Sequence, residues 1–200
     1  MIPAIVLAAG RSTRFGRPKA LLPAGDGRTF AGRVLATLRD AGVDGAVVVT
    51  RAQDDDLVAE VEQFAPFARA VENPEPDRGQ LSSLLIGLAA IDRPGVRAAL
   101  VTLIDVPLVA ADTVRHLLAT ARAERAAIVR PIHDGRHGHP VIFTRAFFDE
   151  LRGADPSSGA NAVVHRHRDA VRDVSVSDAG CVEDVDTPAD YERLFGRPPL

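Results

Sequence analysis

Hydrophobic positions along the chain repeat with two different periods, which predicts strands and helices in alternation. Short apolar runs, typical of strands that are buried on both faces of a sheet, recur through the first half of the chain. They cover residues 2–9, 46–49, 68–72 and 98–103. Between and after them, apolar residues recur at helical spacing in residues 30–41, 57–64, 81–88 and 114–121. This order predicts an α/β fold in which helices cover both faces of a mostly parallel sheet.

The second half of the chain carries a different pattern. Two strand-like stretches, residues 127–131 and 140–144, flank an Asp134-Gly135 step that is typical of a tight hairpin turn. The remaining predicted elements are a helix over residues 145–151, a helix that residues 155–159 open and that runs through Val164, a strand at 171–176, and a last helix that begins at Thr187-Pro188. Because nothing in the sequence resembles a linker between domains, we expect residues 1–200 to form one domain.

The first predicted strand leads into a loop rich in glycine and cations, residues 10–19. A glycine directly after a strand lets the backbone turn sharply, and successive backbone N–H groups can then hold phosphate oxygens. Arg14 and Lys19 are among the cations that would balance phosphate charge. The spacing differs from that of G-x-x-x-x-G-K-[ST] and G-x-G-x-x-G loops. The loop therefore favours a polyphosphate site of another type, and a surface loop kept soluble by its cations is the alternative.

Two carboxylates are candidates for a magnesium site. Asp105 follows the predicted strand at 98–103 and should lie at the same sheet edge as the glycine loop, because ligands of parallel sheets bind at the carboxyl ends of strands. Asp186 precedes the last predicted helix. Mg²⁺ bound with a polyphosphate takes one or two carboxylates and keeps several waters. The alternative is structural, with Asp105 as a turn residue before Pro107 and Asp186 as a helix-capping residue.

Other residues of metal-binding or nucleophilic type are present, but their patterns favour structural roles. Asp54-Asp55-Asp56 stands at a predicted helix start, where acidic side chains interact favourably with the helix dipole. Zinc would need three or four ligands that converge tetrahedrally, which the arms of a hairpin do not supply. The histidines considered for zinc are His133, His137, His139, His165 and His167. The single cysteine, Cys181, is expected to be buried or inert.

Composition narrows the class of protein further. The chain of 200 residues is 46% hydrophobic and has a net charge of −3. Because it has no long basic run, we do not expect it to bind nucleic acid. The N-terminal apolar run is too short to span a membrane and lacks the charged start of a secretory signal. Together with the single cysteine, these features predict a soluble cytoplasmic protein.

Several segments, taken in order, resemble the MobA-like nucleotidyltransferase family, and most closely its molybdenum cofactor cytidylyltransferase branch. They are Leu7-Ala8-Ala9-Gly10-Arg11-Ser12-Thr13-Arg14-Phe15-Gly16 with Lys19, Gly79-Gln80-Leu81-Ser82-Ser83-Leu84, Asp105-Val106-Pro107, Gly138-His139-Pro140 and Asp184-Val185-Asp186-Thr187-Pro188. The resemblance covers nearly the whole chain and implies a Rossmann-like three-layer α/β/α sandwich of the nucleotide-diphospho-sugar transferase type. It also implies transfer of a nucleoside monophosphate from an NTP to a phosphorylated acceptor, with release of pyrophosphate.

The resemblance also implies roles for individual residues. Arg14, Lys19, Asp105 and Asp186 would be catalytic, and the two aspartates would bind Mg²⁺. The nucleotide would be bound by Leu7, Ala8, Ala9, Gly10, Arg11, Ser12, Lys19, Gln80, Ser82 and Ser83. The acceptor would contact Gly138, His139 and Asn161, where Asn161 stands at a position that more often carries a cation in the family. The nucleotide-binding half would cover about residues 1–109, and the acceptor-binding half about residues 110–200.

Three functions are consistent with these residues. The first is a Mg²⁺-dependent cytidylyltransferase that acts on molybdopterin or its molybdenum-bound form. CTP is favoured over GTP because Ala9 matches the cytidylyl branch, whereas guanylyl relatives tend to have glycine there. The second is a nucleotidyltransferase that uses GTP or another NTP, or another acceptor such as a sugar phosphate. The third is a non-catalytic nucleotide-binding or cofactor-delivery protein. A molybdoenzyme or a delivery chaperone would be the partner that receives the product.

Overall fold

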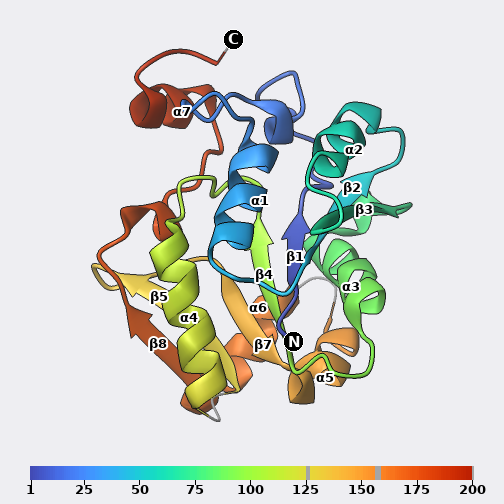
Figure 1. The fold of residues 1–200 in the computed structure, drawn as a ribbon, viewed down its shortest axis with the longest axis vertical. Coiled ribbons are helices and arrows are strands. Elements are labelled where there is room, and N and C mark those ends of the chain that lie inside the picture. The colour runs from blue at the N-terminus through green and yellow to red at the C-terminus, as the bar shows by residue number, and fades with distance from the viewer. Residues whose placement is uncertain (125–126, 156–158, 200) are drawn as a thin grey trace.

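A mixed eight-stranded sheet forms the middle layer of the computed structural model, which describes residues 1–124, 127–155 and 159–199 (Figure 1). The strands are β1 (Ala4–Leu7), β2 (Ala46–Arg51), β3 (Ala68–Asn73), β4 (Ala98–Leu103), β5 (Ile128–His133), β6 (Arg136–His137), β7 (Val141–Thr144) and β8 (Val171–Ser175). Their order is β3-β2-β1-β4-β7-β5-β6, with β8 paired to β5. β7 runs antiparallel to both β4 and β5, and β6 runs antiparallel to β5. The other pairs are parallel, which confirms a mostly parallel sheet.

Helices cover both faces of the sheet. They are α1 (Phe30–Asp40), α2 (Asp55–Glu62), α3 (Gln80–Ile91), α4 (Ala111–Ala123), α5 (Phe148–Arg152), α6 (Gly159–Arg166) and α7 (Pro188–Phe195). Helix α1 contacts α2 and α4 on one side, whereas α3 contacts α5 and α6 on the other. Figure 1 shows α1 and α4 in front of the sheet and α6 behind it. The predicted three-layer α/β/α sandwich is therefore confirmed.

The apolar runs of the strands divide their side chains between two cores. In β1, Ala4 and Val6 pack under α1 and α4, while Ile5 and Leu7 pack under α3. Because successive side chains point to opposite faces, a strand covered on both sides must be apolar at every position. Burial of each large aliphatic side chain contributes roughly 1.5–3 kcal/mol relative to exposure. The sequence predicts this strand over residues 2–9, but β1 ends at Leu7, because the following residues leave the ladder to line a cleft.

Helix α7 docks at the carboxyl edge of the sheet through aromatic rings. Thr187 caps its start in a reciprocal capping box with Asp190, as the sequence predicts. The ring of Tyr191 packs against Phe30 and Phe195, and its hydroxyl donates to the carbonyl of Pro23 at 2.8 Å. This docking brings the segment before α7 to the end of β4. The result places Asp186 next to the glycine loop.

The Asp134-Gly135 step forms the predicted hairpin turn between β5 and β6. Both residues have positive φ, 46° and 77°, as a type I′ turn requires. The turn does not bring histidines together: His133 contacts the Val176 carbonyl at 3.0 Å, whereas His137 lies 3.4 Å from Asp173. Among the described residues, no helix is long and apolar enough to cross a membrane.

Candidate active site

A cleft of about 310 Å³, which we call the first cleft, opens at the carboxyl ends of β1 and β4. It is lined by Leu7, Ala8, Ala9, Gly10, Ser12, Lys19, Pro76, Gly79, Gln80, Ser83, Leu103, Ile104 and Asp105. These residues come from the glycine loop, from the start of α3 and from the end of β4. The structure thus brings together most of the residues that the sequence assigns to nucleotide binding, while Arg11 and Ser82 lie outside this lining.

Lys19 joins the two predicted carboxylates at one end of the first cleft. Its Nζ atom lies 2.8 Å from Asp186 Oδ1 and 3.2 Å from Asp105 Oδ2. The side chain is only 12% exposed, and its backbone N–H donates to Ser12 Oγ at 3.0 Å. Arg14, a more exposed cation, lies 4.0 Å from Asp186. Segments far apart in the sequence therefore bring cations and carboxylates together at this place.

Although Lys19 pairs with both carboxylates, one of their oxygens keeps a free position for a ligand. Asp105 Oδ1 is buried and has no hydrogen-bond partner among the described residues. The pKa of nearby Asp184 is raised by partial desolvation of its carboxyl group and by the charges of Asp105 and Asp186. Carboxylate oxygens are the ligands that Mg²⁺ and Mn²⁺ prefer, so Asp105 and Asp186 fit a divalent ion. Within the described parts of the chain, no group of three or more acidic, histidine or cysteine side chains is arranged for a metal. An ion bound here would complete its shell with water or ligand oxygens.

A second set of paired charges joins the glycine loop to the segment that precedes α3. Arg11 donates to both oxygens of Asp77, with Nε 2.8 Å from Oδ1. Arg51 lies 3.8 Å from the same carboxylate and donates to the Ala9 carbonyl at 3.2 Å. The hydrogen bonds and charge of Arg11 lower the pKa of Asp77. The sequence reasoning missed Arg51 and Asp77, although Arg51 ends β2 at the same sheet edge, which is the signal that could have found it.

A second cleft of about 280 Å³ adjoins the first one. It is lined by Leu7, Gln80, Leu81, Leu84, Val101, Leu103, His139, Val141, Phe143, Gly159, Ala160, Asn161 and Val164. Leu7, Gln80 and Leu103 belong to both clefts, so ligands in the two clefts would be neighbours. Most of the residues that line the second cleft have apolar side chains, and Gln80, His139 and Asn161 are the polar ones, but polar and apolar atoms share its exposed surface about equally.

His139 is held in the second cleft with an unused ring nitrogen. Its Nδ1 atom is buried without a hydrogen-bond partner in the described structure, and its backbone N–H donates to the Cys181 carbonyl at 2.8 Å. Burial lowers the pKa of His139, while the charge of Asp105 opposes that shift. Gly138 does not line the cleft. A Cβ atom there would lie 2.0 Å from the Cys181 carbonyl oxygen, so glycine is needed for close backbone packing.

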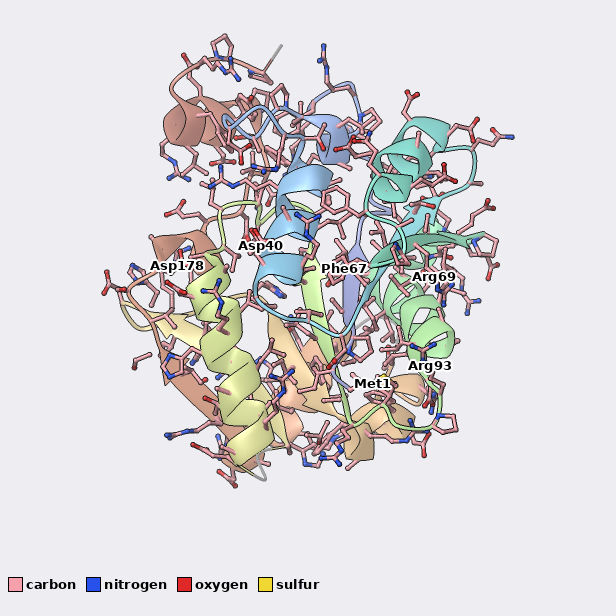
Figure 2. The ribbon with its side chains drawn as sticks, in the orientation of Figure 1. Met1, Asp40, Phe67, Arg69, Arg93 and Asp178 are labelled. Atoms are coloured by element: carbon pink, nitrogen blue, oxygen red, sulfur yellow. The ribbon has the colours of Figure 1, made fainter. Side chains whose placement is uncertain are left out.

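The other residues that the sequence offers as possible ligands or nucleophiles have structural roles. Asp55 and Asp56 lie in the first turn of α2, as the helix interpretation predicts. Cys181 is fully buried, as the sequence predicts, and its burial raises the thiol pKa to about 11. A further groove of about 200 Å³ lies at the opposite, amino-terminal edge of the strands, near Phe67, Arg69 and Arg93 (Figure 2). None of the residues that the sequence assigns to the site lines that groove.

Comparison with known proteins identifies relatives over the full chain. A family model described as MobA-like NTP transferase domain matches residues 4–171. Nicotine blue oxidoreductase from Paenarthrobacter nicotinovorans is 30% identical over 97% of this chain and 96% of its own length. A probable molybdenum cofactor guanylyltransferase from Rhodopirellula baltica is 29% identical over 96% of this chain and 90% of its own. The chain spans only 25% of bifunctional protein GlmU from Clavibacter sepedonicus, with 35% identity over 62% of this chain.

Solved structures of other proteins are also similar to this chain over nearly its full length. Rv0371c from Mycobacterium tuberculosis H37Rv superposes with a TM-score of 0.82 and 35% identity, covering 98% of this chain and 97% of that one. A manganese complex of Rv0371c gives a TM-score of 0.77 with 31% identity, covering 98% of each chain. The chain belongs to the MobA-like NTP transferase family, and molybdenum cofactor guanylyltransferases are among its relatives.

Proposed function

We propose that this chain is a Mg²⁺-dependent cytidylyltransferase that transfers CMP from CTP to the phosphate of molybdopterin or its molybdenum-bound form. The observation that carries the proposal is the meeting of Lys19 with Asp105 and Asp186 beside two adjoining clefts. A triphosphate bound with a divalent ion needs cations and carboxylates in one place, because charges of both signs must be balanced there. The adjoining clefts would hold donor and acceptor side by side.

In this proposal, residues 1–109 bind the nucleotide. The backbone of the glycine loop and the side chains of Gln80 and Ser83 contact its base and sugar. Arg11, Arg14 and Lys19 hold the phosphates, and each of these cations already lies within 4.0 Å of a carboxylate. Nucleotide binding would therefore exchange one anionic partner for another, which limits the desolvation that binding costs.

Asp105 and Asp186 are the residues that would hold the metal ion. The unpartnered Asp105 Oδ1 atom supports this role, as does the manganese complex formed by Rv0371c. We propose Mg²⁺ as the ion because polyphosphates in cells are normally bound as magnesium complexes. When bound, the ion would neutralise charge on the triphosphate and on the leaving pyrophosphate.

The proposed chemistry needs no nucleophile from the protein. An oxygen of the acceptor phosphate attacks the α-phosphorus of the NTP, the bond to the bridging oxygen of the β-phosphate breaks, and pyrophosphate leaves with the electron pair. Lys19 and Arg14 stabilise the negative charge that builds on the leaving group. A phosphate monoester has its second pKa near about 6, so it is already largely ionised and requires no general base. Catalysis then rests on positioning.

The proposal also specifies the acceptor substrate and the nucleobase of the NTP. The second cleft combines apolar side chains with polar groups such as His139 and Asn161, which supports an acceptor that joins a ring system to hydrogen-bonding groups. Gly138 would contribute by letting His139 approach the Cys181 carbonyl. Ala9 supports CTP, whereas the guanylyltransferase relative supports GTP as the alternative. A sugar phosphate is the alternative acceptor.

Nucleotide selectivity tests the proposal. Calorimetry in the presence of Mg²⁺ would compare CTP, GTP, ATP and UTP, followed by a pyrophosphate-release assay with purified molybdopterin. We expect CTP to bind most tightly and to release pyrophosphate when the acceptor is added. Tighter binding of GTP would move the assignment to guanylyl transfer with the same mechanism. If none of the four nucleotides binds, the nucleotidyltransferase proposal is wrong, and a delivery protein becomes the favoured function.

Oxidoreduction is a second candidate function, favoured by the full-length match to nicotine blue oxidoreductase. The apolar side chains of the second cleft are compatible with a small aromatic substrate as well. Adding NADH and NADPH to the same calorimetric panel separates the two candidates. Binding of a dinucleotide without binding of any NTP would favour oxidoreduction, and the reverse result would favour nucleotidyl transfer.

A further inference from the structure

Asn73 ends β3 beside the first cleft, and its amide makes three hydrogen bonds inside the protein. The residue is 1% exposed. Its Oδ1 atom accepts from the backbone N–H of Glu75 at 2.9 Å. Its Nδ2 atom lies 2.9 Å from the hydroxyl oxygens of both Ser82 and Ser83. These bonds hold Asn73 against the first turn of α3, where both serines lie.

The contact with Glu75 decides which way the amide points. A backbone N–H can only donate, so the amide atom that faces it must be the oxygen of Asn73. The amide nitrogen must then face the two serines, and this nitrogen can only donate. Both serine oxygens therefore accept a hydrogen bond from Asn73. Each hydroxyl keeps its own proton for another partner.

The two serines differ in where that proton can go. The Ser82 hydroxyl donates to the Gly79 carbonyl at 2.8 Å and also lies 3.2 Å from the Glu75 carbonyl. The Ser82 hydroxyl proton is thus already used in a hydrogen bond within the protein. Within the described residues, the Ser83 hydroxyl proton has no acceptor, although Ser83 is 5% exposed and lines the first cleft. A nearly buried donor of this kind is satisfied when a ligand brings the acceptor.

We propose that Asn73 is a positioning residue that holds the Ser83 hydroxyl as a hydrogen-bond donor toward the nucleoside of the bound NTP. The inference rests on the proposed function, because it takes the first cleft to be the nucleotide site. Asn73 acts through Ser83 and does not touch the nucleotide. The nucleoside contributes an acceptor, such as a carbonyl oxygen of the base. Ser82, to which the resemblance assigns nucleotide binding, lies outside the cleft lining, and in this proposal it takes no part in binding.

Reversing the polarity of the amide tests the inference. The Asn73→Asp substitution keeps the size of the side chain but replaces the donor with a carboxylate oxygen, to which the Ser83 hydroxyl would then donate. Calorimetry would use the NTP that the wild-type protein binds most tightly, in the presence of Mg²⁺. We expect both Asn73→Asp and Ser83→Ala to weaken binding by roughly five- to tenfold, the factor that one hydrogen bond supplies. The matched control, Ser82→Ala, should bind like the wild type.

The double variant separates positioning from a general structural effect. If Asn73 acts through Ser83, the Asn73→Asp and Ser83→Ala double variant should lose no more affinity than either single variant. Losses that multiply would show that Asn73 acts by another route and would overturn the inference. Thermal melting would check that each variant folds. Should Asn73→Asp fail to fold, Asn73→Ser, which keeps a small polar side chain, would replace it in the same cycle.

Two further outcomes tell this inference apart from the proposed function. Wild-type binding with no loss in Ser83→Ala would overturn the role of Asn73 and Ser83 while leaving the nucleotide site in place. A loss in Ser82→Ala equal to that in Ser83→Ala would also overturn it, because the Ser82 proton is used within the protein. No NTP binding by the wild type would overturn both the function and the inference.

Discussion

The two clefts share part of one wall but hold their polar groups in opposite ways. In the first cleft, Lys19 is paired with Asp105 and Asp186, so each charge already has a partner. In the second cleft, His139 keeps a buried ring nitrogen without a partner in the described structure and lies among apolar side chains. An anionic ligand would bind in the first cleft by replacing carboxylates as the partners of its cations. A ligand would bind in the second cleft mainly through the match between its shape and that of the cleft.

Because the clefts differ in this way, they should tolerate different amino-acid substitutions. Function in the first cleft should depend on the sign and position of charges, because several charged groups act on one small volume. Function in the second cleft should depend on backbone packing, because its polar groups are few and Gly138 packs against Cys181 at a distance that excludes a side chain.

The largest effect is expected from Asp105→Asn. The substitution keeps the shape of the side chain but removes a charge that binds Lys19 and would bind the metal ion. We expect turnover to fall by about 10³-fold, the scale on which loss of transition-state electrostatics acts. Pyrophosphate release would measure the loss. The melting temperature should change little, because Asp105 lies at the cleft and not in either core.

A matched control for that substitution is Asp112→Asn. Asp112 is an exposed acidic residue in the first turn of α4, away from both clefts. It should leave turnover within about twofold of the wild type, since isolated surface charges contribute little. Full activity in Asp105→Asn would contradict the charge-exchange view of the first cleft.

Gly138→Ala should have the next largest effect, on stability. The added Cβ atom would lie 2.0 Å from the carbonyl oxygen of Cys181, and backbone cannot move aside as a flexible side chain can. We expect the free energy of unfolding to fall by about 3 kcal/mol, at the upper end of overpacking costs. Chemical denaturation would measure it. Gly10→Ala is the matched control, because a Cβ atom there meets nothing within 4 Å and stability should change by less than about 0.5 kcal/mol.

The sequence predicts the first cleft better than the second for a physical reason. Gly10, Lys19 and Asp105 lie in segments that follow or end strands, and parallel strands gather their carboxyl ends at one edge. This rule needs only the order of strands and helices. The same rule finds the ends of β2 and β3, yet it does not show that Arg51 pairs with Asp77 or that Asn73 bonds to Ser83 in the cleft wall.

The second cleft depends on which strands lie next to each other in the sheet, and the spacing of apolar residues does not predict that. β7 inserts antiparallel between β4 and β5, and its residues Val141 and Phe143 line the cleft. The apolar pattern at residues 140–144 indicates a strand but not its partners. Gly138 illustrates the same limit, since its close approach to Cys181 joins segments far apart in the chain. Such contacts follow from tertiary packing.

Lys19→Gln should have a smaller effect, with a sign that tests the exchange of charge partners. Lys19 Nζ lies between the carboxylates that would hold a metal ion, so its removal should free them. Without nucleotide, we expect Mn²⁺ to bind up to about fivefold more tightly than to the wild type, because partly exposed ion pairs contribute up to about 1 kcal/mol. Electron paramagnetic resonance of free Mn²⁺ would measure this affinity. The same variant should bind NTP more weakly.

The distant substitution Arg39→Gln serves as the control for Lys19→Gln. Arg39 pairs with Asp40 on α1 and should leave Mn²⁺ affinity unchanged. Weaker Mn²⁺ binding by Lys19→Gln would mean that the ammonium group supports the carboxylate geometry and does not compete with the ion. Unchanged Mn²⁺ binding would place the metal site elsewhere.

The smallest effect is expected at His139 and concerns pH. Burial lowers the pKa of this imidazole below its usual 6.5, so the unfolded chain takes up a proton before the folded protein does. The stability that neutral His139 contributes is therefore complete above pH 6.5 and declines as the pH falls toward the lowered value. The charge of Asp105 opposes the shift. Between pH 7.0 and 6.0, we expect the stability advantage of the wild type over His139→Gln to shrink by at most about 0.7 kcal/mol, because the unfolded chain takes up about half a proton at this site over that range. Denaturation at both pH values would measure it, and an advantage that grows on acidification would show that His139 is held as the cation.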